Sequence, residues 1–529
     1  MASPDDARQF LRPRLEQLHD PRLMGGLERA VERIVAAIRD GETIFIHGDY
    51  DVDGICSTTL LTRALRGMGA TVVPFIPRRL QDGYDLTMAG VEAAVRAGAK
   101  VVVTCDCGTS AREPIRVLCE HGIDVIVSDH HLPGGPLPDC LAVLNPRRPG
   151  CDYPDKDLAA VGVAFKLALG VARALGASEN PILGMLDLVA LATVADIAPL
   201  RGENRILVRY GLRLMAETRN IGLRALIRAA GLEGKPLTSG RIGYILAPRL
   251  NAVGRLDHAL RGVQLLTTED ESEANRIARE LEELNRRRQD IDRATLTRVK
   301  EIIATIDLDA TWGLVLAEEG WHPGVIGIVA SRVVEEFARP TMLIAIHDGV
   351  GKGSGRSIPA FDLHAGLGEC RDLLLRYGGH RAAAGLTVER DRIPELAERF
   401  NAVARARLVE DDLTPVVRVD LEVPLVAASG DMEKLLRHFE PFGVGNPAPV
   451  LMVRGARIQG PPRLVGRERD GLRLRLADGT VSLDALGWGM APLAPSLTPG
   501  MEVDVAFRLE RDEWNGRSFL QAKIAGLRW

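Results

Sequence analysis

The sequence predicts an α/β protein in which a parallel-sheet domain, a long helix and a smaller α/β domain are followed by an all-β domain. Three observations predict this order. From residue 43 onward, short apolar runs alternate with helical patterns. Residues 269–306 are rich in charge and have helical spacing, and from about residue 411 apolar and polar residues alternate. A length of 529 residues fits roughly three or four domains.

Composition and charge narrow the class of protein. The chain is 46% hydrophobic and 26% charged, and no apolar stretch reaches the roughly 20 residues that a membrane-spanning helix needs. The amino terminus lacks the apolar core of a signal peptide, and seven cysteines without a regular framework favour a reducing compartment. We therefore expect a cytoplasmic protein without membrane contact. The net charge of −4 decides little about nucleic acid, because acidic groups at a metal site would mask basic patches.

The first 268 residues are expected to hold a helical segment at 1–42 and then a sheet. Strands are predicted at residues 43–48, 71–77, 100–105, 124–128 and 141–145, and helices at 55–66, 86–97 and 112–121. This alternation favours a parallel sheet with helices on both faces, which binds ligands beyond the carboxyl ends of its strands. Residues 205–262 have mainly helical spacing, with residues 247–257 expected to form a loop between helices.

Acidic and histidine side chains gather at these strand ends. They are His47, Asp49, Asp51 and Asp53 after the first strand, Asp106 after the third, and Asp129, His130 and His131 after the fourth. Crowded carboxylates repel one another unless a cation neutralises them, and oxygen ligands with some imidazole suit Mg²⁺ or Mn²⁺. Asp196, near the end of a buried helical element, is a further candidate. A solvated acidic turn or a helix-terminal aspartate would explain each group alone, but three strand ends at one rim favour a metal site.

Residues 307–410 repeat the α/β pattern on a smaller scale, after a connecting helix that would reach roughly 55 Å. Glycines in GVGKGSGRS and YGGHRAAAG surround Ser354, Arg356 and His380 and would let donors approach an anion. A glycine-rich hairpin is the alternative. Arg249 and Arg255, in APRLNAVGRLD, are candidates for phosphate binding or for ordinary surface salt bridges.

Residues 411–529 have the strand pattern of a small antiparallel barrel such as an OB-fold. Barrels of this kind often bind single strands through stacking and basic side chains. The candidate contacts are Arg454, Arg457, Arg473, Arg475 and Arg508. Solvent-facing strand residues are the alternative for each of them.

These motifs resemble a known family. HGDYDVDG, the Asp106 strand end, SDHH at residues 128–131 and Asp196 resemble the DHH phosphoesterase superfamily, and GSGRS and GGH resemble its DHHA1 companion domain. APRLNAVGR, the long helix and the β-domain make nearly the whole chain similar to the RecJ family of single-strand-specific 5′→3′ exonucleases. The resemblance implies a DHH catalytic domain (43–268), a connecting helix (269–306), a DHHA1 domain (307–410) and an OB-fold-like domain (411–529).

The resemblance implies two divalent cations, Mn²⁺ or Mg²⁺, in one site. One ion would be held by His47, Asp51 and Asp106, and the other by Asp53, Asp106, His130 and Asp196, so that Asp106 bridges them. Asp49 would support the loop, and His131 would face the scissile phosphate as a proton donor or hydrogen bond. The catalytic residues implied are therefore His131, Asp106 and Asp49.

The implied reaction is hydrolysis of single-stranded DNA from the 5′ end to 5′-mononucleotides, in DNA repair and recombination. The residues implied in substrate binding are Arg78, Arg255, Ser354 and Arg356 at a 5′-phosphate pocket, and Arg249 and His380 at other phosphates. The implied partners are single-stranded DNA, single-strand-binding protein and a RecQ-type helicase, for a monomeric enzyme.

Two other functions remain open. A DHH phosphoesterase for short oligonucleotides or cyclic dinucleotides would not need the long helix and the β-domain. A catalytically inert single-strand-binding scaffold would be expected to lack metal ligands, whereas every ligand position is filled here.

Overall fold

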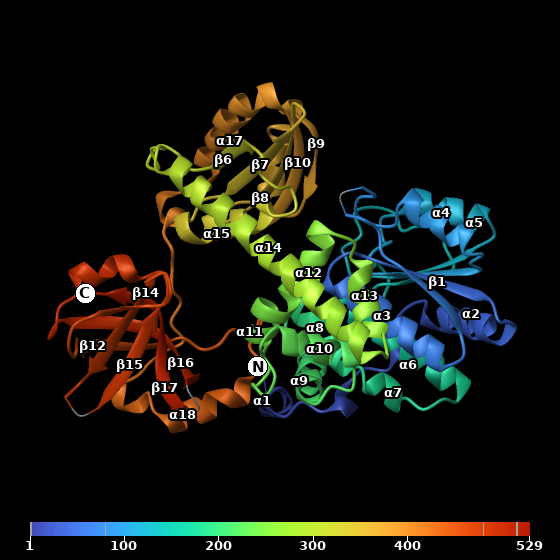
Figure 1. Cartoon of the computed structure of the whole chain (residues 1–529), viewed down its shortest axis with the longest axis horizontal. Coiled ribbons are helices and arrows are strands. Elements are labelled where there is room, and N and C mark those ends of the chain that lie inside the picture. Colours follow the sequence, from blue (N-terminus) through green and yellow to red (C-terminus); the bar gives the residue numbers. More distant parts are fainter. Residues whose placement is uncertain (1–2, 80, 480, 515–516) are drawn as a thin grey trace.

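The computed structural model describes residues 3–79, 81–479, 481–514 and 517–529. They form three lobes, each built on its own sheet, with a long helix crossing between two of them (Figure 1). The predicted fold class is confirmed in its order: a parallel sheet, a long helix, a smaller α/β sheet and an all-β domain.

The first sheet is parallel and has the strand order β2-β1-β3-β4-β5. Its strands are β1 (Thr43–Gly48), β2 (Thr71–Phe75), β3 (Val101–Cys105), β4 (Asp124–Ser128) and β5 (Ala142–Leu144). Side chains of successive residues enter different cores: Ile44 and Ile46 pack in one cluster, and Phe45 packs in the other. Both faces are therefore covered, as expected from near-continuous apolar strands.

Helices cover both faces of this parallel sheet. The helices of this first part are α1 (Pro4–Leu11), α2 (Leu27–Asp40), α3 (Val52–Gly67), α4 (Met88–Arg96), α5 (Arg112–Glu120), α6 (Ala160–Leu175), α7 (Asn180–Leu183), α8 (Leu186–Ala195), α9 (Gly202–Ala216), α10 (Ile221–Ala229), α11 (Ser239–Arg241), α12 (Ala247–Leu256) and α13 (Leu260–Thr267). Helices α4 and α5 cover one face, and α2, α3 and α6 cover the other.

The prediction of a loop at residues 247–257 is wrong, because this segment forms helix α12. Pro248 would normally break a helix interior, but here it directly follows a π-helical turn, Ile242–Leu246, where the regular hydrogen-bond pattern of the helix is already changed. Gly254, in the same helix, allows a close approach: a Cβ there would lie 2.4 Å from the carbonyl oxygen of Tyr50. This contact brings α12 against the loop that follows β1.

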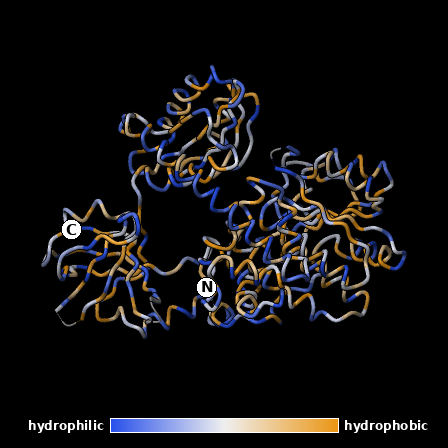
Figure 2. The backbone as a smooth tube through the Cα atoms, in the orientation of Figure 1, coloured by the Kyte–Doolittle hydropathy of each residue, from blue (hydrophilic) through white to orange (hydrophobic). Residues whose placement is uncertain are grey.

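The connecting helix is a single element, α14 (Glu271–Ile303), of 33 residues. Asp270 caps it by accepting hydrogen bonds from the amides of Ser272 and Glu273. Its first half packs Ile277 into the core of the parallel-sheet domain, and its second half packs Val299 into the core of the next domain. At 1.5 Å per residue it spans about 50 Å. Figure 2 shows hydrophilic residues recurring along α14, consistent with its narrow apolar stripe.

The second sheet has the order β6-β7-β8-β10-β9 and is mixed. Its elements are β6 (Leu314–Glu319), α15 (Ile326–Phe337), β7 (Thr341–His347), β8 (Val350–Arg356), α16 (Leu363–Gly368), β9 (Leu374–Gly379), β10 (Ala383–Glu389) and α17 (Ile393–Arg407). Gly351, Gly353 and Gly355 of GVGKGSGRS lie within β8, which pairs with β7 and β10, so the amides of this strand serve the sheet. A Cβ on Gly353 would come within 2.7 Å of Leu386, so packing accounts for this glycine.

The carboxyl-terminal domain is a β-domain of seven strands in the order β11-β12-β16-β17-β15-β14-β13, and β12 also pairs with β14. Its elements are β11 (Leu421–Glu422), α18 (Gly430–Leu436), β12 (Leu451–Ile458), β13 (Arg463–Val465), β14 (Gly471–Ala477), β15 (Ser482–Gly487), β16 (Glu502–Trp514) and β17 (Arg517–Arg528). The additional pairing closes the sheet, which agrees with the predicted barrel. Among the described residues, no helix is both long and apolar enough to cross a bilayer.

Candidate metal centre

The acidic strand ends lie side by side because their strands are neighbours. The hydrogen-bond ladder continues past the strands: Asp49 N donates to the carbonyl of Cys105 at 3.1 Å, and Asp106 N donates to Ser128 at 3.0 Å. The residues that follow strands β1, β3 and β4 therefore lie together at one edge of the sheet. This is the edge, beyond the carboxyl ends of the strands, at which parallel sheets bind ligands. Asp106 has a φ of +64°, an uncommon conformation for a residue other than glycine.

Helix termini hold the other two aspartates of the first motif. Asp51 caps α3 by accepting from the amide of Asp53 at 2.9 Å. Asp53 in turn accepts from the amides of Ala160, at 2.7 Å, and Val161, at 2.8 Å, at the start of α6. These amide donors and the positive ends of the two helices favour negative charge here. Gly54 has a packing reason, since a Cβ on it would lie 2.3 Å from the Asp49 carbonyl oxygen.

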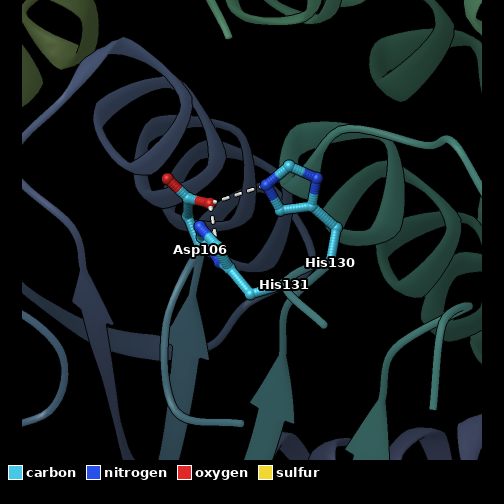
Figure 3. A group of neighbouring side chains, drawn as sticks. All are labelled: Asp106, His130 and His131. Carbon is cyan, nitrogen blue, oxygen red and sulfur yellow. Dashed lines mark ion pairs between the residues drawn. The ribbon is translucent and has the colours of Figure 1, made fainter. Parts of the chain in front are cut away.

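Within the residues that the structure describes, three overlapping groups of potential ligands result. Within each group the ligand atoms lie within 4.8 Å of one another; the groups are Asp49, Asp51 and Asp106; Asp53, His130 and Asp196; and Asp106, His130 and His131. Figure 3 shows the Asp106 carboxylate directed at both histidine rings. His130 Nε2 lies 3.3 Å from Asp106 Oδ1 and 3.8 Å from Asp196 Oδ2. Asp106 therefore links the first group to the second through His130.

Several of these buried atoms make no hydrogen bond within the described residues. Asp49 Oδ1, Asp106 Oδ1 and His130 Nε2 have no hydrogen bond within the part of the chain that the structure describes. Each buried, unsatisfied polar atom costs about 1–3 kcal/mol, which makes such a cluster in one place expensive. Carboxylate oxygens with one imidazole nitrogen are a donor set that suits Mn²⁺ or Mg²⁺. The residues present therefore fit two divalent cations.

Electrostatics support the same fit. Burial, and then the charge of neighbouring carboxylates, raises the pKa values of Asp49, Asp106 and Asp196 well above their usual range. The same two causes raise the pKa of Asp53 to about 7. Burial, and then the charge of His131, lowers the pKa of His130 to about 4, which keeps its ring neutral. A bound cation would offset the cost of burying these charged carboxylates together. The imidazole of His130 is already neutral, which is the form that binds a metal ion.

His131 differs from His130 although it is the next residue. Its Nδ1 lies 2.7 Å from Asp129 Oδ1, and its Nε2 lies 3.2 Å from the hydroxyl of Tyr84. Burial opposes the charged ring, but Asp129 raises the pKa of His131 to about 9. Asp129 also accepts from the amide of Thr109 at 3.0 Å. The ring is thus a partly exposed, protonated group with a fixed orientation. Sequence reasoning did not single out Tyr84; its place in the loop after β2, near the same rim, was the available signal.

His47 lies apart from the ligand groups. It is buried within β1, with Nδ1 at 3.6 Å from Cys107 Sγ. A Cβ on Gly90 of α4 would lie 2.6 Å from its Nε2, so this nitrogen faces α4. Among the described residues, the group with Asp51 and Asp106 contains Asp49 and not His47.

Comparisons with known proteins agree with this architecture. Three family models match: the DHH family N-terminal domain at residues 43–193, the DHHA1 domain at 309–406 and the RecJ OB domain at 419–526. The single-stranded-DNA-specific exonuclease RecJ of Dickeya dadantii (strain 3937) is 36% identical, over 98% of this chain and 93% of its own. The chain belongs to the RecJ family.

Two further RecJ proteins show the extent of the match. The RecJ of Bacillus subtilis (strain 168) is 37% identical over 98% of this chain, and the chain spans 65% of that protein. The crystal structure of RecJ in complex with Mn²⁺ from Thermus thermophilus superposes with a TM-score of 0.83 and 35% identity. That superposition covers 99% of this chain and 74% of the other.

A second cluster in this RecJ-family chain is basic. Arg255 Nη1 donates to the carbonyl of Gly324 at 2.7 Å, and Arg356 Nη1 donates to that of Gly355 at 2.8 Å. Burial, and then the charges of Arg79, Arg288 and Arg356, lowers the pKa of Arg255 to about 10. Arg79, Arg255 and Arg356 have no carboxylate partner within the described ranges of the chain. Such a cluster is suited to an anion.

Neighbouring groups extend this basic cluster. A Cβ on Gly327, in the first turn of α15, would lie 2.7 Å from Ser354 Oγ and 3.2 Å from Arg356 Nη2. The guanidinium of Arg79 lies 4.7 Å from the ring centroid of Tyr50. Arg78, the predicted residue, is exposed and donates to Gln81 instead. Arg78 and Arg79 are adjacent in one loop, and it is Arg79 that turns toward the basic cluster. The sequence carried no signal for this difference.

The other predicted contacts have different surroundings. Arg249 forms an ion pair with Glu282 of α14. His380 is exposed at the turn between β9 and β10. In the β-domain, ion pairs join Arg454 to Glu422, Arg457 to Glu502 and Arg473 to Asp484. Arg475 donates to the Ser482 hydroxyl. Arg508 is exposed and has no ion pair among the described residues.

Proposed function

We propose that this chain is a metal-dependent exonuclease that degrades single-stranded DNA from the 5′ end and releases 5′-mononucleotides in DNA repair and recombination. The observation that carries the proposal is the pair of ligand groups linked through Asp106, with buried atoms that make no hydrogen bond among the described residues. The names of its relatives, single-stranded-DNA-specific exonucleases, and the Mn²⁺ complex of the Thermus thermophilus protein support it.

The proposed ligands are divided between two ions. Asp49, Asp51 and Asp106 would hold one ion; Asp53, Asp106, His130 and Asp196 would hold the other. Asp49 replaces His47 in the set that the resemblance implies, because Asp49 lies with Asp51 and Asp106. Two such ions would lower the pKa of a bound water and would stabilise charge on the attacking and leaving oxygens of a phosphodiester. Asp53 keeps its place through the amides at the start of α6.

His131 is proposed to donate a hydrogen bond or a proton to the scissile phosphate. Asp129 occupies Nδ1 and orients the ring, which leaves Nε2 for the substrate. In the free protein the Tyr84 hydroxyl lies at that nitrogen, where a phosphate oxygen would replace it. The raised pKa keeps the ring protonated at neutral pH, as a donor requires.

The basic cluster is proposed to recognise the terminal 5′-phosphate and so to set the polarity. Guanidinium forks suit a phosphate dianion, and the amino-terminal turn of α15 adds favourable amide dipoles. Arg79, Arg255 and Arg356 would supply the forks, with Ser354 as a further donor. Arg249 fits less well, because Glu282 already pairs with it. Arg78 and His380 stay proposed contacts for neighbouring phosphates.

The test is a comparison of long oligonucleotides labelled at the 5′ or the 3′ end, as single strands or blunt duplexes, with Mn²⁺, Mg²⁺ or chelator. The expected result is early release of mononucleotide from the 5′ label on single strands, abolished by chelator and by Asp106→Ala. Equal activity on blunt duplex would contradict single-strand specificity. Cleavage confined to very short oligonucleotides or cyclic dinucleotides would favour the small-substrate phosphoesterase, and binding without shortening would favour the inert scaffold.

Other expectations remain proposals that rest on the resemblance. They are the domain limits at residues 42, 268, 306 and 410, the monomeric state, the cytoplasmic location, and the partners single-strand-binding protein and a RecQ-type helicase. Size-exclusion chromatography with light scattering checks the monomer, and pull-down with each purified partner checks the association.

A further inference from the structure

Residues 440–446 precede strand β12 of the β-domain and are here called the return segment. They pack against the loop that follows Asp196. The amide of Leu200 donates to the carbonyl of Val444 at 2.7 Å. Arg205, in the first turns of α9, donates from Nη2 to the carbonyl of Glu440 at 2.9 Å. A segment more than 200 residues away in the sequence thus holds the backbone next to a proposed metal ligand.

The fit between the two segments is close. A Cβ on Gly443 would lie 2.7 Å from Leu200 Cδ1, and one on Gly445 would lie 3.1 Å from Pro199 Cβ. Leu200 itself is 2% exposed. Any atom added to Gly443 must therefore displace Leu200 or the return segment, and with it the loop.

The return segment is internally braced. The side-chain amide of Asn446 donates to the carbonyls of Phe439 and Pro441, both at 2.8 Å. The backbones of Gly443 and Asn446 also pair, with Gly443 N donating to Asn446 O at 2.9 Å. These bonds hold the return segment in one conformation where it contacts the loop that follows Asp196.

The loop turns sharply directly after the proposed ligand Asp196. Asp196 is the C-cap of α8, and the next residue, Ile197, has a φ of +62° although it is β-branched. Such a conformation costs on the order of 1–2 kcal/mol for a residue other than glycine. At the helix end it is held by two bonds, from Ile197 N to Val194 O and from Ala198 N to Thr193 O, both at 3.2 Å. Beyond this turn the loop has two further anchors: the Pro199 carbonyl accepts from Asn204 Nδ2 at 3.2 Å, and Leu200 N donates to the return segment.

From these contacts we infer that the return segment is a positioning element of the metal centre: by holding Leu200 it fixes the strained loop and keeps the Asp196 carboxylate beside Asp53 and His130. The ligand concerned is a divalent cation, and the inference rests on the proposed function. Asn446 and Gly443 are positioning residues in this view, although they lie within the stretch that matches the RecJ OB domain.

The test uses the full chain and measures Mn²⁺ binding directly by isothermal titration calorimetry. Gly443→Ala should weaken one Mn²⁺ site about 10-fold or more, the size of effect seen when outer-shell support of a ligand is lost. Its affinity for a single-stranded oligonucleotide, measured in chelator, should not change. Gly67→Ala is the matched control, because a Cβ at that helix-end glycine meets nothing within 4 Å.

A second change separates positioning from general damage. Leu200→Ala in the Gly443→Ala background removes the clashing atoms and should restore Mn²⁺ affinity at least in part. If Gly443→Ala does not fold, Asn446→Ala removes two hydrogen bonds without adding atoms and should show the same selective loss. Unchanged Mn²⁺ affinity in the folded variants would overturn the inference. Failure of the proposed function would appear instead in the wild-type chain, as no Mn²⁺ binding or no shortening of DNA.

Discussion

The sharpest quantitative prediction concerns Asp53 in the metal-free protein. Its side chain is fully buried, and it accepts hydrogen bonds from the amides of Ala160 and Val161. Burial, and then the charge of Asp51, raises its pKa from 3.8 to about 7. Asp53→Asn removes the titrating group and keeps nearly the same shape.

The sign and size of the effect follow from linkage. Because the folded-state pKa of Asp53 is raised, its contribution to stability is fully present below pH 3.8 and is lost as the pH rises towards about 7. The difference between a pKa of 3.8 and one of about 7, at about 1.36 kcal/mol per pH unit, amounts to roughly 4 kcal/mol. Asparagine does not titrate. The variant should therefore gain roughly 4 kcal/mol relative to wild type between about pH 4 and about pH 8, on top of a constant loss of about 1–3 kcal/mol for one poorly replaced hydrogen bond.

The measurement is native-state hydrogen exchange of amides in β1 and β3, in chelator, at several pH values and corrected for intrinsic rates. It reports the opening of this sheet separately from the other domains. A constant difference between variant and wild type across the pH range would refute the reasoning. Saturating Mn²⁺ should reverse the order at about pH 8, because the ion proposed to bind Asp53 stabilises the protein that retains this carboxylate more than the variant.

Three more predictions concern single side chains. Asp49→Ala should abolish Mn²⁺-dependent release of mononucleotides as completely as Asp51→Ala, whereas His47→Ala should reduce it less; equal, mild losses in all three would make the loop an ordinary acidic turn. Arg255→Met should remove the preference for 5′-phosphorylated over 5′-hydroxyl ends in a competition assay, and an unchanged preference would contradict the anion site. His131→Asn should lower kcat about 10²–10⁴-fold while Mn²⁺ affinity measured by calorimetry stays nearly constant, since its loss removes proton donation; a matching loss of Mn²⁺ affinity would make it a ligand.

Much of the fold could be predicted because its signals are local. Strand and helix periods in the sequence identified the five strands of the first sheet, and the strand-end rule then collected Asp49, Asp106 and Asp129 at one rim. Helix α12 was missed because Pro248 normally ends a helix, whereas here the helix runs on from the π-helical turn Ile242–Leu246 into α12. No local pattern in the sequence marks such a turn.

The details of the candidate site depend on contacts between distant segments, which local patterns do not encode. His47 stands in the same motif as Asp51, but its Nε2 faces Gly90 of α4, so the packing of that helix decides which way the ring points. Arg79 was missed beside Arg78 because neither residue lies in a regular element that would fix its direction.

The glycines of HGDYDVDG and GVGKGSGRS show how one sequence feature can have two causes. Gly54 makes room for the carbonyl of Asp49, so this glycine shapes the loop that delivers a ligand. Gly353 makes room for Leu386 in a regular ladder, so the anion contacts proposed for the second motif are those of the Ser354 and Arg356 side chains and not of free amides. The sequence predicts a metal-binding loop from the first motif and an anion-binding, glycine-rich loop from the second. The hydrogen-bond ladder removes the backbone amides from the second prediction, because an amide already donating within a sheet is not available to a phosphate.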